Sequence, residues 1–229
     1  AAESLQKVHV PAGLKAELVA AEPLVMVPVA IDWASDGSIW VAEMADYPSG
    51  GNGHSGRIVR LMDVDGDHRP DQRQVFIGSV NFPTGIMAWG KGVIVTAGGE
   101  IFYAEDLDGD GGADRRETWF SGFMEGNQQL RVNGLRWGLD DWIYCASGGH
   151  HAGFGVGTII KCVKTGKQVK LGARDFRFRP DGAFEPASGP SQFGRVRDND
   201  GNWFGVQNAH PLWHYVLDDR YLGRNPDVP

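Results

Sequence analysis

One unit recurs four times along this chain of 229 residues, and it constrains the fold more than any other feature. Each copy has a short apolar segment, a polar turn and a second apolar segment. The central turns are Asp36-Gly37, Lys91-Gly92, Asp140-Asp141 and Asp200-Gly201, and such turns between alternating apolar residues indicate β-hairpins. The four copies occupy residues 28–43, 83–98, 132–147 and 193–208.

Two further strand-like segments follow each of the first three hairpins. They cover residues 57–62 and 72–77, 100–105 and 115–120, and 158–163 and 167–171. Four strands in a repeat of roughly 40 to 60 residues are typical of a propeller blade. The sequence therefore predicts an all-β fold, a β-propeller of about four blades, each a four-stranded antiparallel sheet. A β-sandwich with the same spacing is the alternative.

We expect one propeller domain over residues 1–229, with a lead-in segment at residues 1–27. Residues 224–229 contain no closing strand, which favours a propeller that is incomplete at its C-terminal end and belongs to a six-bladed one. A small or open propeller is the alternative. The chain begins Ala-Ala-Glu-Ser, which we interpret as the end left by signal-peptide cleavage, so a periplasmic or secreted location is expected.

Two acidic loops at equivalent places in successive repeats share the pattern D-x-D-G-D-x-x-x-D. Carboxylates at positions 1, 3, 5 and 9, with a backbone carbonyl near position 7, supply the oxygen ligands that Ca²⁺ prefers. Glycine at position 4 separates these loops from EF-hands, and they resemble the calcium loops of FG-GAP propellers. We predict about two structural Ca²⁺ ions; a solvated turn without an ion is the alternative, and Mg²⁺ is less suited. The predicted ligands are Asp63, Asp65, Asp67, Asp71 and the carbonyl of Arg69, and Asp106, Asp108, Asp110, Asp114 and the carbonyl of Gly112.

The acidity of the chain excludes several classes of function. The formal net charge is −7, whereas proteins that bind nucleic acid normally carry a basic face. The longest apolar run, residues 24–31, contains Pro28 and is far shorter than a membrane-spanning helix. No CxxCH sequence is present, so there is no haem attachment motif. We expect no nucleic-acid partner and no direct membrane insertion.

The strand order of a blade places the acidic loops on one face and the residues that flank the hairpins on the other, where the central channel opens. Functional residues tend to lie on loops held by a rigid scaffold, although such residues can also be ordinary polar caps. His150, His151 and His210 on this channel face are candidates for a general base or a metal ligand. The predicted binding residues of the channel face are Glu43, Asp46, Tyr47, Asn81, Arg131, Asn133, Gln192 and Asn208.

Two further features leave alternatives open. Cys145 and Cys162 are equidistant from the centre of a Gly-rich loop, so a hairpin there would place them opposite one another for a disulfide. Two packed thiols are the alternative. Tryptophans recur at the ends of the hairpin strands, which favours packing between blades over a stacking platform for sugar.

Four segments carry a resemblance to a known family: residues 125–144, 17–33, 81–87 and 205–217. They resemble the N-terminal propeller of the large membrane-bound dehydrogenase family of planctomycetes and verrucomicrobia, the PVC-type haem-binding proteins. That propeller is distantly similar to the six-bladed soluble quinoprotein glucose and sorbosone dehydrogenases. The resemblance implies pyrroloquinoline quinone (PQQ) and Ca²⁺ at the channel and a histidine base before the first strand of one blade. The matching residues 128–131 contain no histidine, and Leu130 stands at that place.

These observations support three hypotheses about function. The first is a calcium-stabilised binding or assembly module that docks other protein subunits, as part of a larger redox complex. The alternative is a PQQ-dependent dehydrogenase of sugars or alcohols, and the second alternative is a carbohydrate-binding propeller. The missing base favours the binding module.

Overall fold

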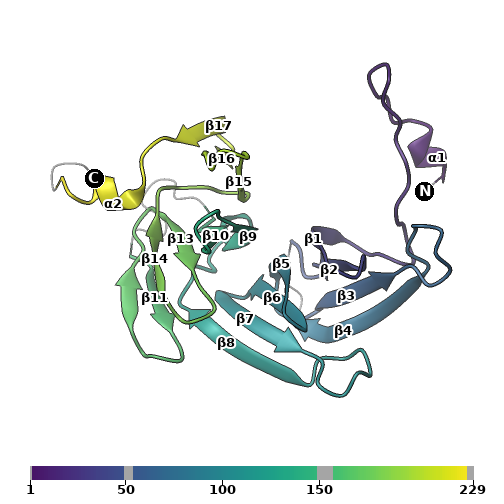
Figure 1. Cartoon of the computed structure of the whole chain (residues 1–229), viewed down its shortest axis with the longest axis horizontal. Coiled ribbons are helices and arrows are strands. Elements are labelled where there is room, and N and C mark those ends of the chain that lie inside the picture. Colours follow the sequence, from purple (N-terminus) through teal and green to yellow (C-terminus); the bar gives the residue numbers. More distant parts are fainter. Residues whose placement is uncertain (1, 49–53, 149–156, 226–229) are drawn as a thin grey trace.

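The structure, a computed structural model, describes residues 2–48, 54–148 and 157–225. Four antiparallel sheets follow one another around an arc, with the N-terminal segment at one end and the C-terminal helix at the other (Figure 1). The predicted all-β class and propeller-like arrangement are confirmed. Three short helical elements accompany the sheets: α1 (Ala2–Leu5), η1 (Gln128–Leu130) and α2 (Asp219–Leu222).

The first two sheets contain the first two predicted blades. The first has the order β1-β2-β3-β4, formed by β1 (Pro28–Trp33), β2 (Ile39–Glu43), β3 (Gly56–Met62) and β4 (Gln72–Val80). The second contains β5 (Pro83–Trp89), β6 (Gly92–Ala97), β7 (Glu100–Glu105) and β8 (Arg115–Ser121) in order. Their registers follow the predicted hairpin turns.

The third sheet corrects the predicted strand assignment. It has the order β14-β13-β10-β9, formed by β9 (Asn133–Trp137), β10 (Ile143–Ala146), β13 (Asp175–Phe178) and β14 (Phe184–Ala187). The segments expected as its outer strands form the hairpin of β11 (Ile159–Cys162) and β12 (Gln168–Lys170). Strand β11 pairs with β8, so this hairpin extends the second sheet to six strands. The fourth sheet has three strands: β15 (Arg195–Arg197), β16 (Trp203–Gln207) and β17 (His210–Tyr215).

The same correction decides between the two alternatives for the cysteines and excludes the disulfide. Cys145 on β10 and Cys162 on β11 are both free and buried, because β10 pairs with β9 and β13 while β11 pairs with β8 and β12. The turn of the hairpin that would have joined them lies outside the described residues. The Cys145 thiol donates to the carbonyl of Phe176 at 3.6 Å, and burial raises the pKa of this thiol well above its usual value. The structure therefore has two packed thiols, the alternative reading of the sequence.

The first strand of each sheet lies on the inner side of the arc and contacts its counterpart in the next sheet. Side chains connect these inner strands: Thr84 Oγ1 donates to the carbonyl of Val132 at 2.5 Å, and Asn133 Nδ2 donates to that of Gln192 at 2.7 Å. Gly134 has a φ of +65°, and a Cβ there would lie 2.4 Å from the Cα of Gly194. Only glycine allows β9 and the segment before β15 to approach so closely.

The largest hydrophobic core lies between the second and third sheets. Phe120 of β8 packs edge-on against Phe176 of β13, with ring centroids 5.3 Å apart. Both cysteines lie in this cluster, as does Ile160 of the added hairpin. Fully burying such a side chain stabilises the fold by roughly 1.5–3 kcal/mol. The β11–β12 hairpin therefore closes one side of this core.

The lead-in segment is attached to the first sheet. The carboxylate of Glu43 accepts a hydrogen bond from the Met26 amide at 2.9 Å, and Ala20 and Val25 pack against the buried face of β2 and β3. Neither described α-helix, each four residues long, is suited to cross a lipid bilayer.

Candidate channel-face binding site

A cavity of about 930 Å³ opens on the inner side of the arc, at the face predicted for the channel. Strands β1, β5 and β9 contribute its walls, and the segments that precede β9 and follow β2 and β16 form its rim. Val29, Ile31 and Phe193 provide exposed apolar surface on the wall. The predicted binding residues that line this channel-face cavity are Tyr47, Arg131, Asn133 and Asn208.

The polar rim consists mainly of asparagine and glutamine residues whose positions are fixed by hydrogen bonds. Asn127 caps η1 by accepting a hydrogen bond from the Gln129 amide at 2.9 Å, which fixes the segment before β9. Gln129 Nε2 donates to the hydroxyl of Tyr47 at 3.0 Å, joining the rims of the first and third sheets. Gln192 lines an adjoining cavity of about 420 Å³, where its Oε1 accepts from the Asn208 amide at 3.1 Å.

Arg131 is the most unusual group in the cavity wall, because it is only 7% exposed. Its Nη2 donates to the carbonyl of Glu125 at 3.0 Å, and its guanidinium lies 4.2 Å from the ring of Phe82. Its Nε and Nη1 are buried without a hydrogen-bond partner, since the Glu125 carboxylate is 4.0 Å from Nη1. Burial lowers the pKa of Arg131, while Glu125 and Asp46 oppose that shift. Two donors of this arginine remain unsatisfied.

Three predicted binding residues have structural roles or lie outside both cavities. Glu43 is buried and pairs with Arg73 at 2.8 Å in addition to holding the lead-in segment. Asp46 is buried and accepts from the amides of Ser55 at 2.7 Å and Phe82 at 3.0 Å, which ties the first sheet to the start of the second. Asn81 lies beside Gly98 and lines neither of the two cavities.

The described lining of the channel-face cavity contains no histidine or carboxylate. Its ionisable side chains are Tyr47, Arg131 and Arg136. His210 is exposed on β17, where its ring stacks on Trp213 at 5.1 Å, and it lies outside this lining. His150 and His151 fall outside the described residues.

The donor set permits a test of the PQQ site that the resemblance implies. Amides and a buried guanidinium can hydrogen-bond the oxygens of an anionic quinone. However, the described lining offers neither a carboxylate for a channel Ca²⁺ nor an imidazole or carboxylate that would accept a substrate proton. The described residues therefore do not fit a complete quinoprotein active site.

The acidic loops connect β3 to β4 and β7 to β8, and their residues are absent from the cavity lining. In each loop, the carboxylates at positions 1, 3 and 9 come within 4.8 Å of one another and could hold a metal ion. The two triads are Asp63, Asp65, Asp71 and Asp106, Asp108, Asp114.

Backbone amides shape both loops in the same way. Asp63 Oδ1 accepts from Gly66 at 2.7 Å, and Asp106 Oδ1 accepts from Gly109 at 2.6 Å. These bonds lower the pKa of both carboxyls, so they remain charged at neutral pH. Asp67 and Asp110 lie outside the triads. Each side chain accepts a hydrogen bond from the backbone amide two residues later, that of Arg69 and that of Gly112 respectively.

A buried polar cluster between the third and fourth sheets has no counterpart among the predicted sites. Asp175 is fully buried and accepts from the Ser191 hydroxyl at 2.6 Å and from Arg195 Nη1 at 3.2 Å. Burial raises the pKa of Asp175, while Arg195 and Ser191 oppose the rise. The sequence carries one signal of this cluster, because Arg195 stands where the other copies of the repeat, aligned on their central turns, have the apolar residues Ile31, Ile86 and Leu135.

One of three comparisons with solved structures supports the propeller-like fold. The PQQ domain of pyranose dehydrogenase from Coprinopsis cinerea has a TM-score of 0.57 at 16% identity, over 87% of this chain and 47% of that domain. The chain thus spans about half the length of that domain. A streptogramin B lyase has a TM-score of 0.44 at 13% identity, over 87% of this chain and 72% of its own. A structure from the nidogen/laminin complex has a TM-score of 0.44 at 12% identity, over 82% of this chain and 74% of its own.

No curated protein matches the sequence significantly. One family matches over residues 1–229, the full length, and it is described as a domain of unknown function, DUF7133. The chain therefore belongs to the DUF7133 family.

Proposed function

We propose that this chain is a calcium-stabilised propeller unit that binds a partner protein at its channel face, as a subunit of a larger extracytoplasmic assembly. The composition of the channel-face cavity carries this proposal. Its amide rim and exposed apolar wall provide hydrogen bonds and burial for a partner, and its described residues lack a proton-accepting group for catalysis.

In this proposal, bound Ca²⁺ ions stabilise the folded propeller unit. The two triads lie on loops at the surface, and we expect them to bind Ca²⁺ in the range of about 10⁻⁴–10⁻³ M typical of extracellular modules. A site of that affinity fills only where Ca²⁺ is abundant, in keeping with the periplasmic or secreted location that this proposal includes. The second loop also contacts the first sheet, because the Ala113 amide donates to the carbonyl of Phe76 at 2.9 Å. An ion there would strengthen the junction of two blades.

A PQQ-dependent dehydrogenase is the second candidate, and the similarity to the pyranose dehydrogenase PQQ domain favours it. At 16% identity this similarity concerns the fold alone. In such an enzyme PQQ would supply the oxidising group, and Arg131 with the rim amides would orient it. The channel-face cavity would then need a base from outside its described lining.

One experiment separates the two candidates. The purified protein is loaded with Ca²⁺ and PQQ, and metal content, visible absorbance and dye reduction with an aldose panel are recorded together. We expect about two Ca²⁺ per chain, in line with the two triads, and no dye reduction. Turnover that is lost in Arg131→Ala would establish the dehydrogenase and overturn the binding module.

A second measurement tests the assembly role directly. A photo-cross-linking residue replaces Asn208 at the channel face or, as the matched control, Leu107 on the opposite face; both are exposed. We expect a discrete adduct with another protein of the source organism from position 208 and none from 107. Equal labelling from both positions, or none from 208, would contradict docking at the channel face.

A further inference from the structure

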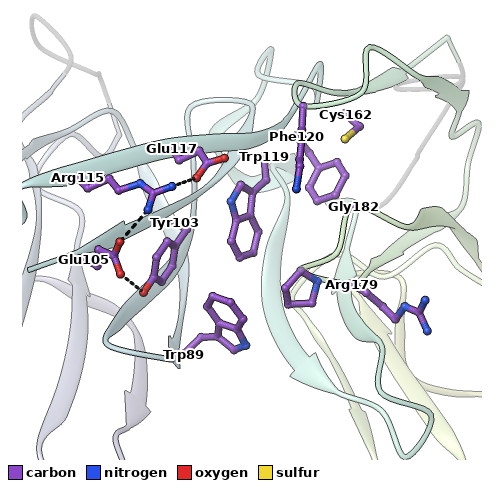
Figure 2. A pocket seen from close by; sticks show the side chains of 12 residues that line it. Trp89, Tyr103, Glu105, Arg115, Glu117, Trp119, Phe120, Cys162, Arg179 and Gly182 are labelled. Atoms are coloured by element: carbon purple, nitrogen blue, oxygen red, sulfur yellow. Dashed lines mark hydrogen bonds and ion pairs between the residues drawn. The ribbon is translucent and has the colours of Figure 1, made fainter. Parts of the chain in front are cut away.

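A separate cavity of about 350 Å³ lies at the end of the second sheet that carries the acidic loop (Figure 2). We call it the aromatic pocket. Strands β5, β7 and β8 form one side, while the β11–β12 hairpin and the turn after β13 form the other. Its lining shares no residue with the channel-face cavity. A ligand here would therefore touch none of the residues that line the channel-face cavity.

Three aromatic rings form one wall of the aromatic pocket. Tyr103 and Trp119 stack with their planes 20° apart and centroids 5.5 Å apart. Trp89 stands nearly perpendicular to both, at 5.2 Å from Tyr103 and 5.5 Å from Trp119. Trp89 and Trp119 remain partly exposed, so their surfaces are available to a ligand. The contacts between the rings fix this wall in advance, which lowers the entropic cost of binding.

A hydrogen-bonded chain of polar groups forms the adjacent wall. Register places Tyr103 opposite Glu117 and Glu105 opposite Arg115, so these side chains share one face of the sheet. The Tyr103 hydroxyl donates to Glu105 at 3.0 Å, and Arg115 donates to Glu105 at 3.0 Å and to Glu117 at 2.7 Å. Burial and Glu105 raise the pKa of Tyr103 to about 12, so the phenol stays a neutral donor. The Glu117 carboxylate accepts one hydrogen bond from Arg115, and its other acceptor positions are available to a ligand.

The charges around the pocket determine which ligand class it suits. Arg115 pairs with both carboxylates, and on the opposite side Lys164 adds positive charge while Arg179 is paired with Asp181 at 2.9 Å, which disfavours a cationic ligand. Glu105, Glu117 and the acidic loop that begins at Asp106 disfavour an anion. A purely apolar ligand would desolvate the ionic wall without compensation. A neutral ligand with one apolar and one hydroxyl-rich side fits both walls.

We propose that the aromatic pocket binds a neutral sugar, with the C–H face of one pyranose ring on Trp89 or Trp119 and its hydroxyls on Glu117 and Arg115. The volume is at the small end of ligand pockets, which suits a single ring. This site extends the carbohydrate-binding alternative to a face of the molecule that the channel does not reach.

The test measures binding of neutral sugars to the full, calcium-loaded chain. Methyl glucoside, methyl galactoside, methyl mannoside, cellobiose and maltose are titrated with saturation-transfer NMR and tryptophan fluorescence as readouts. We expect saturable binding of at least one sugar, with a dissociation constant of about 1 mM. Trp89→Ala should weaken it at least about tenfold, and Glu117→Gln, which preserves shape, should weaken it about threefold or more.

Two controls make the outcome decisive. Trp137→Ala removes the residue at the corresponding end of β9, which is 39% exposed and outside the pocket lining, and it should leave the affinity unchanged. Asn208→Ala at the channel face should also leave it unchanged, so that failure of this site and failure of the channel-face proposal are distinguished. Absence of saturation with every sugar, tighter binding of choline than of any sugar, or parental affinity in both Trp89→Ala and Glu117→Gln would overturn the proposal.

Discussion

At the scale of single residues, the buried Asp175–Arg195 pair makes the sharpest prediction. Arg195 is 3% exposed, and its guanidinium lies 4.6–5.0 Å from the rings of Tyr144, Trp203 and Tyr215. Arg195→Ala removes the partner of a fully buried carboxylate, so it should reduce the free energy of unfolding by about 3–5 kcal/mol. Urea denaturation measures the loss.

The matched control for this pair is Arg220→Ala. Arg220 lies 3.3 Å from Asp218 with both side chains mostly exposed, and such surface pairs contribute little. A loss in Arg195→Ala no larger than in this control would show that the cluster does not hold the third and fourth sheets together.

Individual functional residues were only partly predictable from the sequence. Counting from the hairpin turns places Tyr47, Arg131, Asn133 and Asn208 at the channel face, because that step depends only on strand direction. A polar side chain near the channel can point into the cavity or accept hydrogen bonds from backbone amides. Which of the two it does depends on loop geometry, and the repeat pattern of the sequence does not specify that geometry. Asp46 illustrates this, since it is buried at the junction of two sheets instead of lining the channel.

At the scale of elements, the β11–β12 hairpin shows what local pattern leaves open. Residues 159–162 and 168–170 form strands as expected, because hairpin chemistry is local. Their partner is not local: the outer positions of the third sheet are taken by β13 and β14, and β11 pairs with β8. Sequential order favours neighbours in the chain as partners, and an inserted hairpin violates that rule.

Adjacent isoleucines on β11 test this pairing. Ile160 is fully buried in the core between the second and third sheets, whereas Ile159 is 51% exposed. Ile160→Ala should reduce the free energy of unfolding by about 2–5 kcal/mol, and Ile159→Ala by no more than about 0.5 kcal/mol. Chemical denaturation of the two variants under identical conditions gives the comparison. Equal losses would show that β11 does not present Ile160 to this core.

At the scale of the whole molecule, the repeat explains most of what could be predicted. Four copies of one hairpin require one packing solution to be used repeatedly, and the inner strands β1, β5, β9 and β15 follow one another around the arc as a result. The structure differs from the prediction where the sequence of one copy differs from that of the others. Arg195 replaces an apolar residue in the fourth copy, and its charge must be neutralised by Asp175 from the neighbouring sheet.

Calcium bound to the two acidic loops should stabilise the folded molecule. Eight aspartates in two loops repel one another unless cations neutralise them, and the net charge of −7 adds to that repulsion. Occupation at about tenfold the dissociation constant should raise the Tm by about 3–6 °C for each site, because an ion that binds only the folded state stabilises it by mass action. Chelation should reverse the gain.

The two loops should not contribute equally. The loop of residues 106–114 is hydrogen-bonded to β4 through Ala113 and through Gln74, whose Nε2 donates to the carbonyl of Asp110 at 3.4 Å. These bonds hold the second loop in place, so we expect it to bind Ca²⁺ more tightly than the first loop does. At one Ca²⁺ concentration, Asp108→Asn should then abolish more of the calcium-dependent rise in Tm than Asp65→Asn, its counterpart in the first loop. Scanning calorimetry of both variants with Ca²⁺ and with chelator measures this difference. A Tm that does not respond to Ca²⁺ in the parent chain would contradict the calcium assignment, and equal responses of the two variants would contradict only the role of the second loop at the junction.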